Sequence, residues 1–531
     1  MAKTVTWRPQ QVGTTSKVRD CGQKYRCGFL FLFAMVFAIV APSAPTVFAQ
    51  QAQNQPAEFV TRSGTSLMLA DKPFRYSGPN IEWLGLVGYG PHDPMGPRYP
   101  SHLEIDDALD TAKEMGARVV RSQTMGDSVG CERCIEPRPG VFNDEAFASI
   151  DYALAEGRKH GIRFIMTLVG DCATCTGGGI GQYVAWAQKK DFNDFFTDPK
   201  IIETYEKHIE AVLNHKNTLT GVRYKDDPTI MAWENCNMCG FVTLLMTSSK
   251  DLGPAIAWAE TIGKFVKSID SRHLYLDSTG AFRYDGRDLD IKSSDIVTLE
   301  YYPHWDALLG TGEKTTAKTF SADAATITGK GKVYIATEFG WDVTDWPTQN
   351  DLQEVLRSLE ADPKISGDGF WALQAHVDNF GWQAIPANVS DPNYAKNGES
   401  GQWWALYYGG INTLVNTADD MRARAQLLRA HAFRMMGAEV PPHPAPPPPV
   451  LTTVLLGGLI GWRGSPGAVF YSVQRQNGDS GEWETICGKC ATDADVPWLD
   501  PKPVAGLGVG VKYRVIAPNA DGVPSAPSPP R

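Results

Sequence analysis

The chain has 531 residues, of which 43% are hydrophobic and 21% are charged, so it can bury a large core and should form more than one domain. Its formal net charge of −10 makes it a poor candidate for binding nucleic acid or an anionic membrane surface. A neutral polysaccharide needs no basic surface on its partner, so that class of ligand stays open.

The first 49 residues have the features of a secretory signal peptide. Basic residues up to Arg26 precede an apolar run from Gly28 to Pro42, and small residues then lead to Ala49. The apolar run is short for a membrane span, although an uncleaved anchor is the alternative. Cleavage after Ala49 would remove six basic residues and one acidic residue and change the formal charge to −15. We therefore expect a secreted protein, extracellular or periplasmic, with residues 50–57 as a polar lead-in.

Residues 58–438 alternate short apolar runs with longer amphipathic segments. Helical periodicity is clear in Glu145–His160, which is closed by Gly161, and in Pro199–Leu213. Eight apolar runs separated by helical patterns predict a (β/α)8 TIM barrel, although a doubly wound open sheet has the same alternation. The eight expected strands are Ile81–Val87, Ala117–Gln123, Arg163–Val169, Thr229–Cys236, His273–Asp277, Asp295–Tyr302, Val333–Phe339 and Asp368–Gln374.

The composition changes after residue 438. Residues 439–450 form a proline-rich linker, which favours a semi-rigid polyproline conformation. In residues 451–531, short alternating runs lie between turns, which predicts a small all-β sandwich. The segments Gly461-Trp462-Arg463, Tyr471–Arg475 and Tyr513-Arg514-Val515 are similar to a fibronectin type III module. Such a module can bind substrate, but it is more often a spacer or a stabilising element.

One strand of the expected barrel ends in polar residues and thiols, so we expect its far end to carry functional side chains rather than core packing. It runs Asp226-Asp227-Pro228-Thr229-Ile230-Met231-Ala232-Trp233-Glu234-Asn235-Cys236-Asn237-Met238-Cys239. This strand resembles the fourth barrel strand of the endo-β-1,4-mannanase-like members of glycoside hydrolase family 5, in clan A. The resemblance continues through Val119-Val120-Arg121, Tyr302-Pro303, Val333 to Trp341 and Phe370-Trp371. It implies a barrel enzyme that hydrolyses β-linked polysaccharide with retention of configuration.

The resemblance also implies roles for individual residues. Glu338 matches the nucleophile of the family, and Arg121 and Tyr302 match residues that hold and polarise it. Asn237 would bind the 2-hydroxyl of the sugar that is attacked, and Trp371 would form the floor under that sugar, unless it is an ordinary core tryptophan.

Two positions depart from the family. Met238 stands where the general acid/base glutamate is expected, and Glu300 stands where the family usually has histidine. Glu234 lies about 13 Å from Met238 along an extended strand, so we expect it to support the barrel interior. Glu300 shares a strand face with Tyr302, and we hypothesise that it replaces the missing acid/base, the alternative being that it only fills the histidine position.

The cysteines that follow the expected signal peptide all fall in Cys-x-x-Cys pairs. Three pairs follow barrel strands, and the fourth lies in the C-terminal module; export favours disulfides in all of them, although thiolates that converge on a metal or an iron–sulfur cluster are the alternative. The pairs are Cys131/Cys134, Cys172/Cys175, Cys236/Cys239 and Cys487/Cys490.

These observations favour a secreted glycosidase of the mannan endo-1,4-β-mannosidase type. Whether it is active is left open, because Met238 stands at the position expected for the general acid/base glutamate. The second hypothesis is a carbohydrate-binding barrel that has kept the cleft and lost the chemistry, and the third is a redox or metal protein built on the thiol pairs. We expect a monomer that binds a β-linked polysaccharide or oligosaccharide, needs no cofactor or metal, and binds neither nucleic acid nor, after signal cleavage, a membrane.

Overall fold

The computed structural model describes residues 58–531, apart from several stretches. Those outside the description are 1–57, 89–95, 171–177, 241–242, 244–246, 248–249, 281, 283–284, 307–313, 380, 384–403, 414, 479–480, 494–495 and 504–509. The expected signal peptide and lead-in, and the Cys172/Cys175 pair, therefore lie outside the described residues. Among the described residues, no helix combines the length and the apolar composition that a membrane span requires.

The central element is an eight-stranded parallel sheet, which confirms the predicted (β/α)8 barrel. Its strand order is β4-β11-β10-β9-β8-β7-β6-β5, and a parallel bridge between Asn80 and Arg121 joins the two ends. The strands are β4 (Tyr76–Pro79), β5 (Val119–Ser122), β6 (Arg163–Thr167), β7 (Ile230–Glu234), β8 (Leu274–Asp277), β9 (Ile296–Tyr301), β10 (Val333–Phe339) and β11 (Ile365–Phe370).

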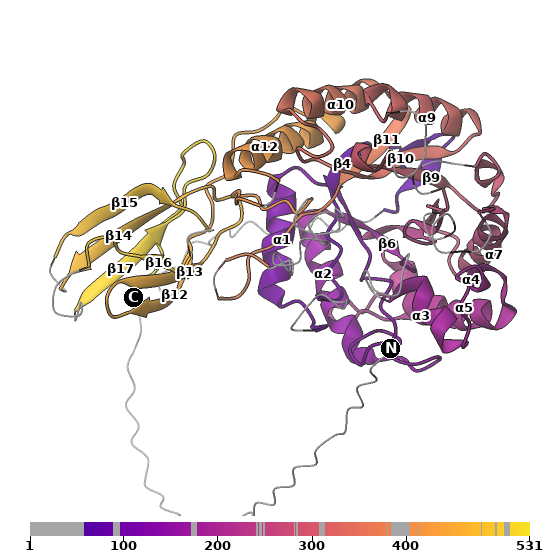
Figure 1. The fold of residues 1–531 in the computed structure, drawn as a ribbon, viewed down its shortest axis with the longest axis horizontal. Coiled ribbons are helices and arrows are strands. Elements are labelled where there is room, and N and C mark those ends of the chain that lie inside the picture. The colour runs from indigo at the N-terminus through magenta and orange to yellow at the C-terminus, as the bar shows by residue number, and fades with distance from the viewer. Residues whose placement is uncertain are drawn as a thin grey trace, which may run out of the picture. The chain divides into compact units, whose positions relative to one another are not determined.

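Helices cover the outside of this sheet, and Figure 1 shows α10 and α12 running beside β4, β10 and β11. The predicted helices at 145–160 and 199–213 appear as α2 and α5, and Gly161 ends α2 in the left-handed conformation, as a C-terminal glycine commonly does. The helices are α1 (His102–Glu114), α2 (Phe147–His160), α3 (Gly179–Trp186), α4 (Asp194–Thr197), α5 (Pro199–Asn214), α7 (Gly253–Ile269), α9 (Ala317–Gly329), α10 (Gln349–Ala361) and α12 (Ala418–Met435).

The prediction of the first barrel strand was wrong. The strand is β4, over Tyr76–Pro79, whereas most of the predicted run at 81–87 forms turns. β4 is fully buried but contains Ser, Gly and Pro, so it lacks the apolar signature of a strand. Gly78 is needed there because a Cβ atom at this position would lie 1.9 Å from the carbonyl oxygen of Val119. The last strand likewise begins and ends earlier than its predicted range of 368–374.

A small antiparallel sheet precedes the barrel and packs against one part of its interior. It consists of β1 (Thr61–Ser63), β2 (Ser66–Leu69) and β3 (Lys72–Pro73). Its Leu67 belongs to the same apolar cluster as Ile165, Leu276 and Ile335 from three barrel strands. In a (β/α)8 barrel the functional residues lie where the carboxyl ends of the strands meet, so the candidate site is expected at that end of the barrel.

The C-terminal segment is all-β, as predicted. It has two three-stranded antiparallel sheets, ordered β12-β13-β16 and β15-β14-β17. Trp462, Tyr471 and Val515 lie in its separate hydrophobic core. The strands are β12 (Val450–Leu455), β13 (Leu459–Arg463), β14 (Tyr471–Asn477), β15 (Trp483–Ala491), β16 (Trp498–Leu499) and β17 (Val511–Ile516).

Candidate active site

Glu338 lies near the end of β10 and is held by side chains from other strands. Its Oε1 accepts a hydrogen bond from Nη1 of Arg121, and its Oε2 accepts one from the hydroxyl of Tyr302 at 2.7 Å. The residue is only 3% exposed. The two residues predicted to hold Glu338 therefore both contact it, and the carboxylate has a fixed orientation.

Arg121 is the centre of a larger buried network. Its guanidinium binds both carboxylate oxygens of Glu234, at 2.7 and 2.8 Å, and donates to Oδ1 of Asn237 at 2.7 Å. A planar guanidinium offers five N–H donors in a fixed arrangement, which suits several simultaneous acceptors. Arg121 thus ties the ends of β5, β7 and β10 together.

The chain leaves the extended conformation directly after Glu234, which changes one sequence-based estimate. β7 ends at Glu234, Met238 has a φ of 54°, and a helical turn begins at Cys239. The distance of about 13 Å between Glu234 and Met238 assumed a straight strand, so it does not apply. Glu234 is buried and supports the site by binding Arg121, while Met238 follows Asn237 and is 8% exposed.

Glu300 is the third carboxylate beside Arg121. β9 and β10 pair Glu300 directly with Glu338, and Oε1 of Glu300 lies 3.7 Å from Nη2 of Arg121. Glu234, Glu300 and Glu338 together would carry three negative charges beside one guanidinium. After burial, the negative charge of Glu234 contributes to raising the pKa of Glu338.

Trp371 follows β11 and is half-buried within an aromatic group. Tyr302 and Trp404 form the buried part of that group, and Trp305 and Trp371 pack against it. The ring centroids of Tyr302 and Trp404 are 4.9 Å apart. An apolar sugar face can stack on such rings, so the group offers a platform beside Glu338.

The electrostatics of the site follow from burial and from these contacts. Burial raises the pKa of Glu338, an effect that Arg121 and Tyr302 reduce but do not cancel. Burial also raises the pKa of Tyr302, and the neighbouring Glu338 and Glu300 raise it further, so its hydroxyl keeps the proton that it donates. Burial alone would lower the pKa of Arg121, but Glu234 and Glu338 outweigh it and raise the pKa.

Two supporting residues were not identified from the sequence. Oδ1 of Asn80 accepts from Arg121 at 3.1 Å, while its Nδ2 donates to the carbonyl of Thr337. The hydroxyl of Thr167 donates to Glu234. Both residues lie at or just beyond the carboxyl end of a barrel strand. That position is the feature of the sequence from which their role could have been predicted.

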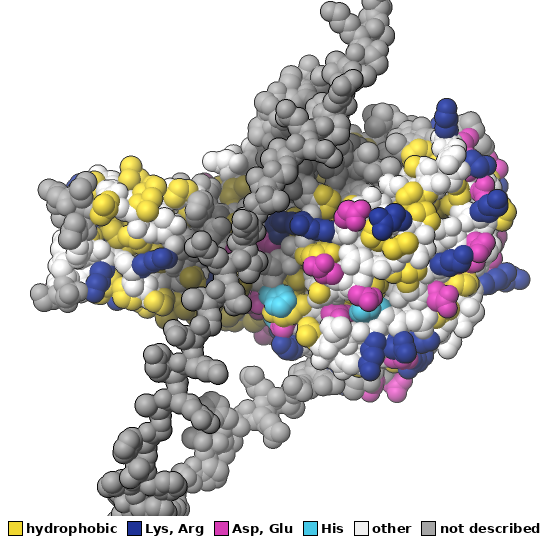
Figure 2. Space-filling view, turned by 90° about the horizontal axis from the view of Figure 1, so that it is seen from below, with side chains coloured by type: hydrophobic (Ala, Val, Ile, Leu, Met, Phe, Trp, Pro, Cys, Tyr) yellow, Lys and Arg dark blue, Asp and Glu magenta, His cyan; other side chains and the backbone are white. Residues whose placement is uncertain are grey.

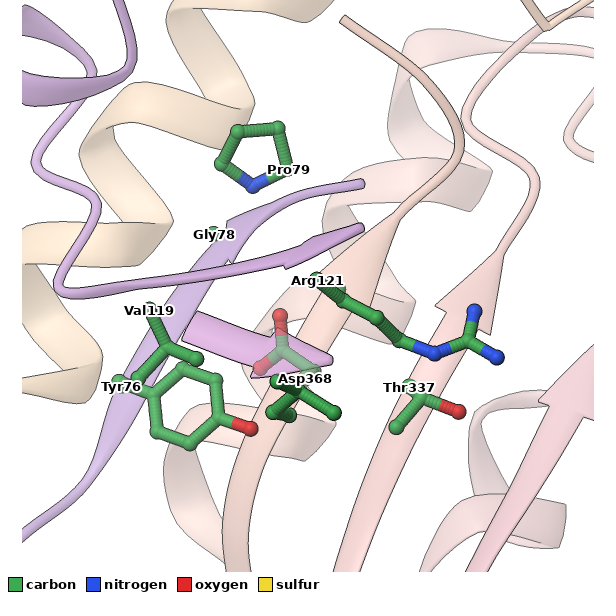
Figure 3. A pocket seen from close by; sticks show the side chains of 9 residues that line it. Tyr76, Gly78, Pro79, Val119, Arg121, Thr337 and Asp368 are labelled. Atoms are coloured by element: carbon green, nitrogen blue, oxygen red, sulfur yellow. The ribbon is translucent and has the colours of Figure 1, made fainter. Parts of the chain in front are cut away.

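A small cavity lies within the barrel beside these residues. Figure 3 shows Arg121 extending from β5 over Asp368 toward Thr337, and Tyr76 also lines this space. The cavity volume is about 10 Å³, which suits roughly one water molecule. It is therefore too small to hold a sugar unit.

The cysteine pairs that the structure describes are disulfides. Their sulfurs are joined in Cys131–Cys134, Cys236–Cys239 and Cys487–Cys490. Over the part of the chain that the structure describes, no group of three or more His, Cys, Asp or Glu side chains is arranged to hold a metal ion. Cys236–Cys239 spans the loop that carries Asn237 and Met238.

Known proteins with similar sequences match part of this chain. Residues 57–293 match the family model described as GH family 5 beta-mannosidase-like. The chain is 37% identical over 224 residues to mannan endo-1,4-beta-mannosidase 7 of Arabidopsis thaliana, covering 41% of this chain and 47% of that protein. It is 30% identical over 331 residues to mannan endo-1,4-beta-mannosidase 4 of Oryza sativa subsp. japonica, covering 60% and 63%. The chain thus spans about half the length of the first curated relatives that it matches.

Solved structures support the same fold. The endo-1,4-beta-mannanase from Rhizomucor miehei superposes with a TM-score of 0.53 at 24% identity, covering 71% of this chain and 99% of that one. The endo-beta-1,4-mannanase from Thermotoga petrophila gives a TM-score of 0.53 at 19% identity, covering 87% and 99%. At these identities the likeness establishes the barrel fold.

Proposed function

We propose that the protein is a retaining glycoside hydrolase that cleaves β-linked mannan, because residues 57–293 match the family model described as GH family 5 beta-mannosidase-like. The observation that carries the proposal is the buried Glu338, held by Arg121 and Tyr302 at the end of β10. Retaining hydrolysis needs an ionised carboxylate that attacks the anomeric carbon. The guanidinium of Arg121 stabilises that ionised form, and the two hydrogen bonds fix its direction.

The neighbouring residues supply contacts for the sugar that is attacked. The Oδ1 atom of Asn237 is occupied by Arg121, which orients the amide so that its Nδ2 can donate to a 2-hydroxyl group. A hydrogen bond to this hydroxyl strengthens in the oxocarbenium-like transition state. Trp371 provides an aromatic face for the same sugar, beside Tyr302 and Trp404.

The acid/base role is assigned to Glu300, because Met238 has no proton to donate. Glu234 binds Arg121 through both oxygens, whereas the Glu300 contact with the same guanidinium is longer, at 3.7 Å. The β9–β10 register also sets Glu300 directly beside Glu338, so the pair comes from adjacent strands.

The second candidate function is a carbohydrate-binding barrel without turnover. Met238 favours it, since loss of general acid/base help typically costs about 10²–10⁴ in rate. The two functions share the sugar contacts of Asn237 and Trp371 and differ only in the chemistry.

The test combines product analysis with binding isotherms on mannan, glucomannan and cellulose. We expect wild type to release mannan oligosaccharides and Glu338→Gln to lose this activity. The hydrolysis rate of Glu300→Gln should fall about 10²–10⁴-fold. Glu203→Gln, an exposed substitution on α5, is the matched control and should behave as wild type. Equal rates for wild type and Glu300→Gln would remove Glu300 from the mechanism, and binding by wild type without turnover would leave the second candidate.

The proposed setting is extracellular or periplasmic, after cleavage of the signal peptide at residues 1–49. A neutral polysaccharide partner agrees with the surface charge, because Lys/Arg and Asp/Glu side chains are interspersed over the barrel face in Figure 2. We assign residues 439–450 to a linker and the all-β segment after it to a fibronectin type III-like module that acts as a spacer or stabilises the protein. We propose a monomer.

A further inference from the structure

Two buried polar groups beside Glu338 have no role in the mechanism above. Nε2 of Gln123 lies 3.5 Å from Oε1 of Glu338, while Oε1 of Gln123 has no hydrogen-bond partner among the described residues. Oε1 of Glu82 receives a contact of 3.5 Å from Nε2 of Gln374, while its Oε2 is buried and also has no partner in the described part of the chain. Gln123 is fully buried, and Glu82 is half-buried as a residue.

Hydrogen bonds join the main chain at Glu82 to the segment that follows Gln123. The carbonyl of Glu82 accepts hydrogen bonds from the amide of Thr124 at 2.9 Å and from its hydroxyl at 2.6 Å. Residues 80–82 and 121–124 therefore form one joined unit at the ends of β4 and β5.

Native proteins pair nearly all buried polar atoms, so an orphan acceptor calls for an explanation. A binding site supplies one, because a ligand hydroxyl can complete the hydrogen bonds. We propose that Glu82 and Gln123 form a subsite that binds hydroxyl groups of a neutral sugar unit of the substrate. This inference rests on the proposed function, since its ligand is the polysaccharide bound beside Glu338.

The chemistry of the subsite selects against acidic sugars. Gln123 presents a carbonyl oxygen, which accepts a hydrogen bond from a hydroxyl group. Burial raises the pKa of Glu82 to about 7, and the nearby charge of Glu338 contributes in the same direction. Below pH 7 the Glu82 carboxyl is mainly protonated and can both donate and accept, as a sugar hydroxyl does, whereas a uronic acid would bring a further negative charge next to Glu338.

The experiment measures binding on a Glu338→Gln background, so that turnover does not interfere. The probe is a soluble β-1,4-linked mannan hexasaccharide, and titration calorimetry gives its Kd. We expect Gln123→Met and Glu82→Met each to weaken binding about tenfold, or about 1.4 kcal/mol, whereas Glu82→Gln keeps Kd within about threefold because it still donates and accepts hydrogen bonds. Gln349→Met, at an exposed site on α10, should leave Kd unchanged.

A stability measurement separates binding from a structural role. Oε1 of Gln123 has no partner among the described residues and its Nε2 lies 3.5 Å from Glu338, at the limit of a hydrogen bond, so an apolar side chain of similar shape removes an unmet polar atom and only a weak contact. Gln123→Met should therefore unfold at an equal or higher urea concentration while it binds sugar more weakly. A loss of stability, or an unchanged Kd in a stable variant, would overturn the subsite.

The outcome is independent of the catalytic question. If wild type does not hydrolyse mannan but these substitutions still weaken binding, the hydrolase proposal fails and the subsite stands. If wild type hydrolyses mannan but neither substitution changes Kd, the subsite fails and the hydrolase stands.

Discussion

At the scale of single residues, the site depends on Arg121, whose guanidinium contacts Glu234, Asn237 and Glu338. We predict that Arg121→Lys lowers kcat/KM on a mannan oligosaccharide at least 100-fold. Lysine keeps the charge but offers three donors from one nitrogen, so it cannot reproduce the paired bonds. Urea unfolding should show a loss of about 1–3 kcal/mol, as expected for unmade buried hydrogen bonds. Wild-type kcat/KM in a stable Arg121→Lys protein would contradict this role.

The sequence could predict which side chains face the barrel mouth, because strand ends are visible in the pattern. Glu338 ends an apolar run before a glycine, whereas its role and those of Tyr302 and Arg121 follow from the family resemblance; the structure brings the three side chains into contact. The contacts of Asn80 and Glu82 could not be predicted in the same way. These contacts depend on how the chain turns after β4, whereas the apolar pattern predicts a strand at residues 81–87.

At the scale of elements, the loop after β7 carries Asn237 between two disulfide-bonded cysteines. Closing a loop of four residues restricts the unfolded chain by about 2 kcal/mol. We predict that the double variant Cys236→Ala/Cys239→Ala loses about this much stability in urea unfolding, and that its kcat/KM falls because Asn237 is held less firmly against Arg121.

The C-terminal module contains a matched control for that variant. Cys487–Cys490 has the same sequence separation of three residues but lies in another hydrophobic core. Its double alanine variant should lose similar stability while kcat/KM on mannan stays unchanged. Equal kcat/KM for the two variants would show that the disulfide after β7 does not position Asn237.

At the scale of the whole barrel, His431 connects the last helix to the sheet. It lies on α12, with Nε2 3.0 Å from Asp368 of β11 and Nδ1 3.0 Å from Glu360 of α10. Burial alone would lower the pKa of His431, but Asp368 and Glu360 outweigh it and raise the pKa to about 9. The charged imidazole thus joins α12 to α10 and to β11.

This raised pKa gives the stability of the barrel a defined pH dependence. The pKa of histidine is about 6.5 in an unfolded chain, so the stabilisation is fully present below pH 6.5 and is lost as the pH rises toward 9. We predict that His431→Gln lowers the free energy of unfolding by up to about 3 kcal/mol at pH 6, and by clearly less at pH 9.5. Urea unfolding at both pH values measures this difference, with exposed His102→Gln as the control. A His431→Gln effect that stays constant between the two pH values would mean that the charge on His431 does not stabilise the fold, because its hydrogen bonds alone would be lost equally at both.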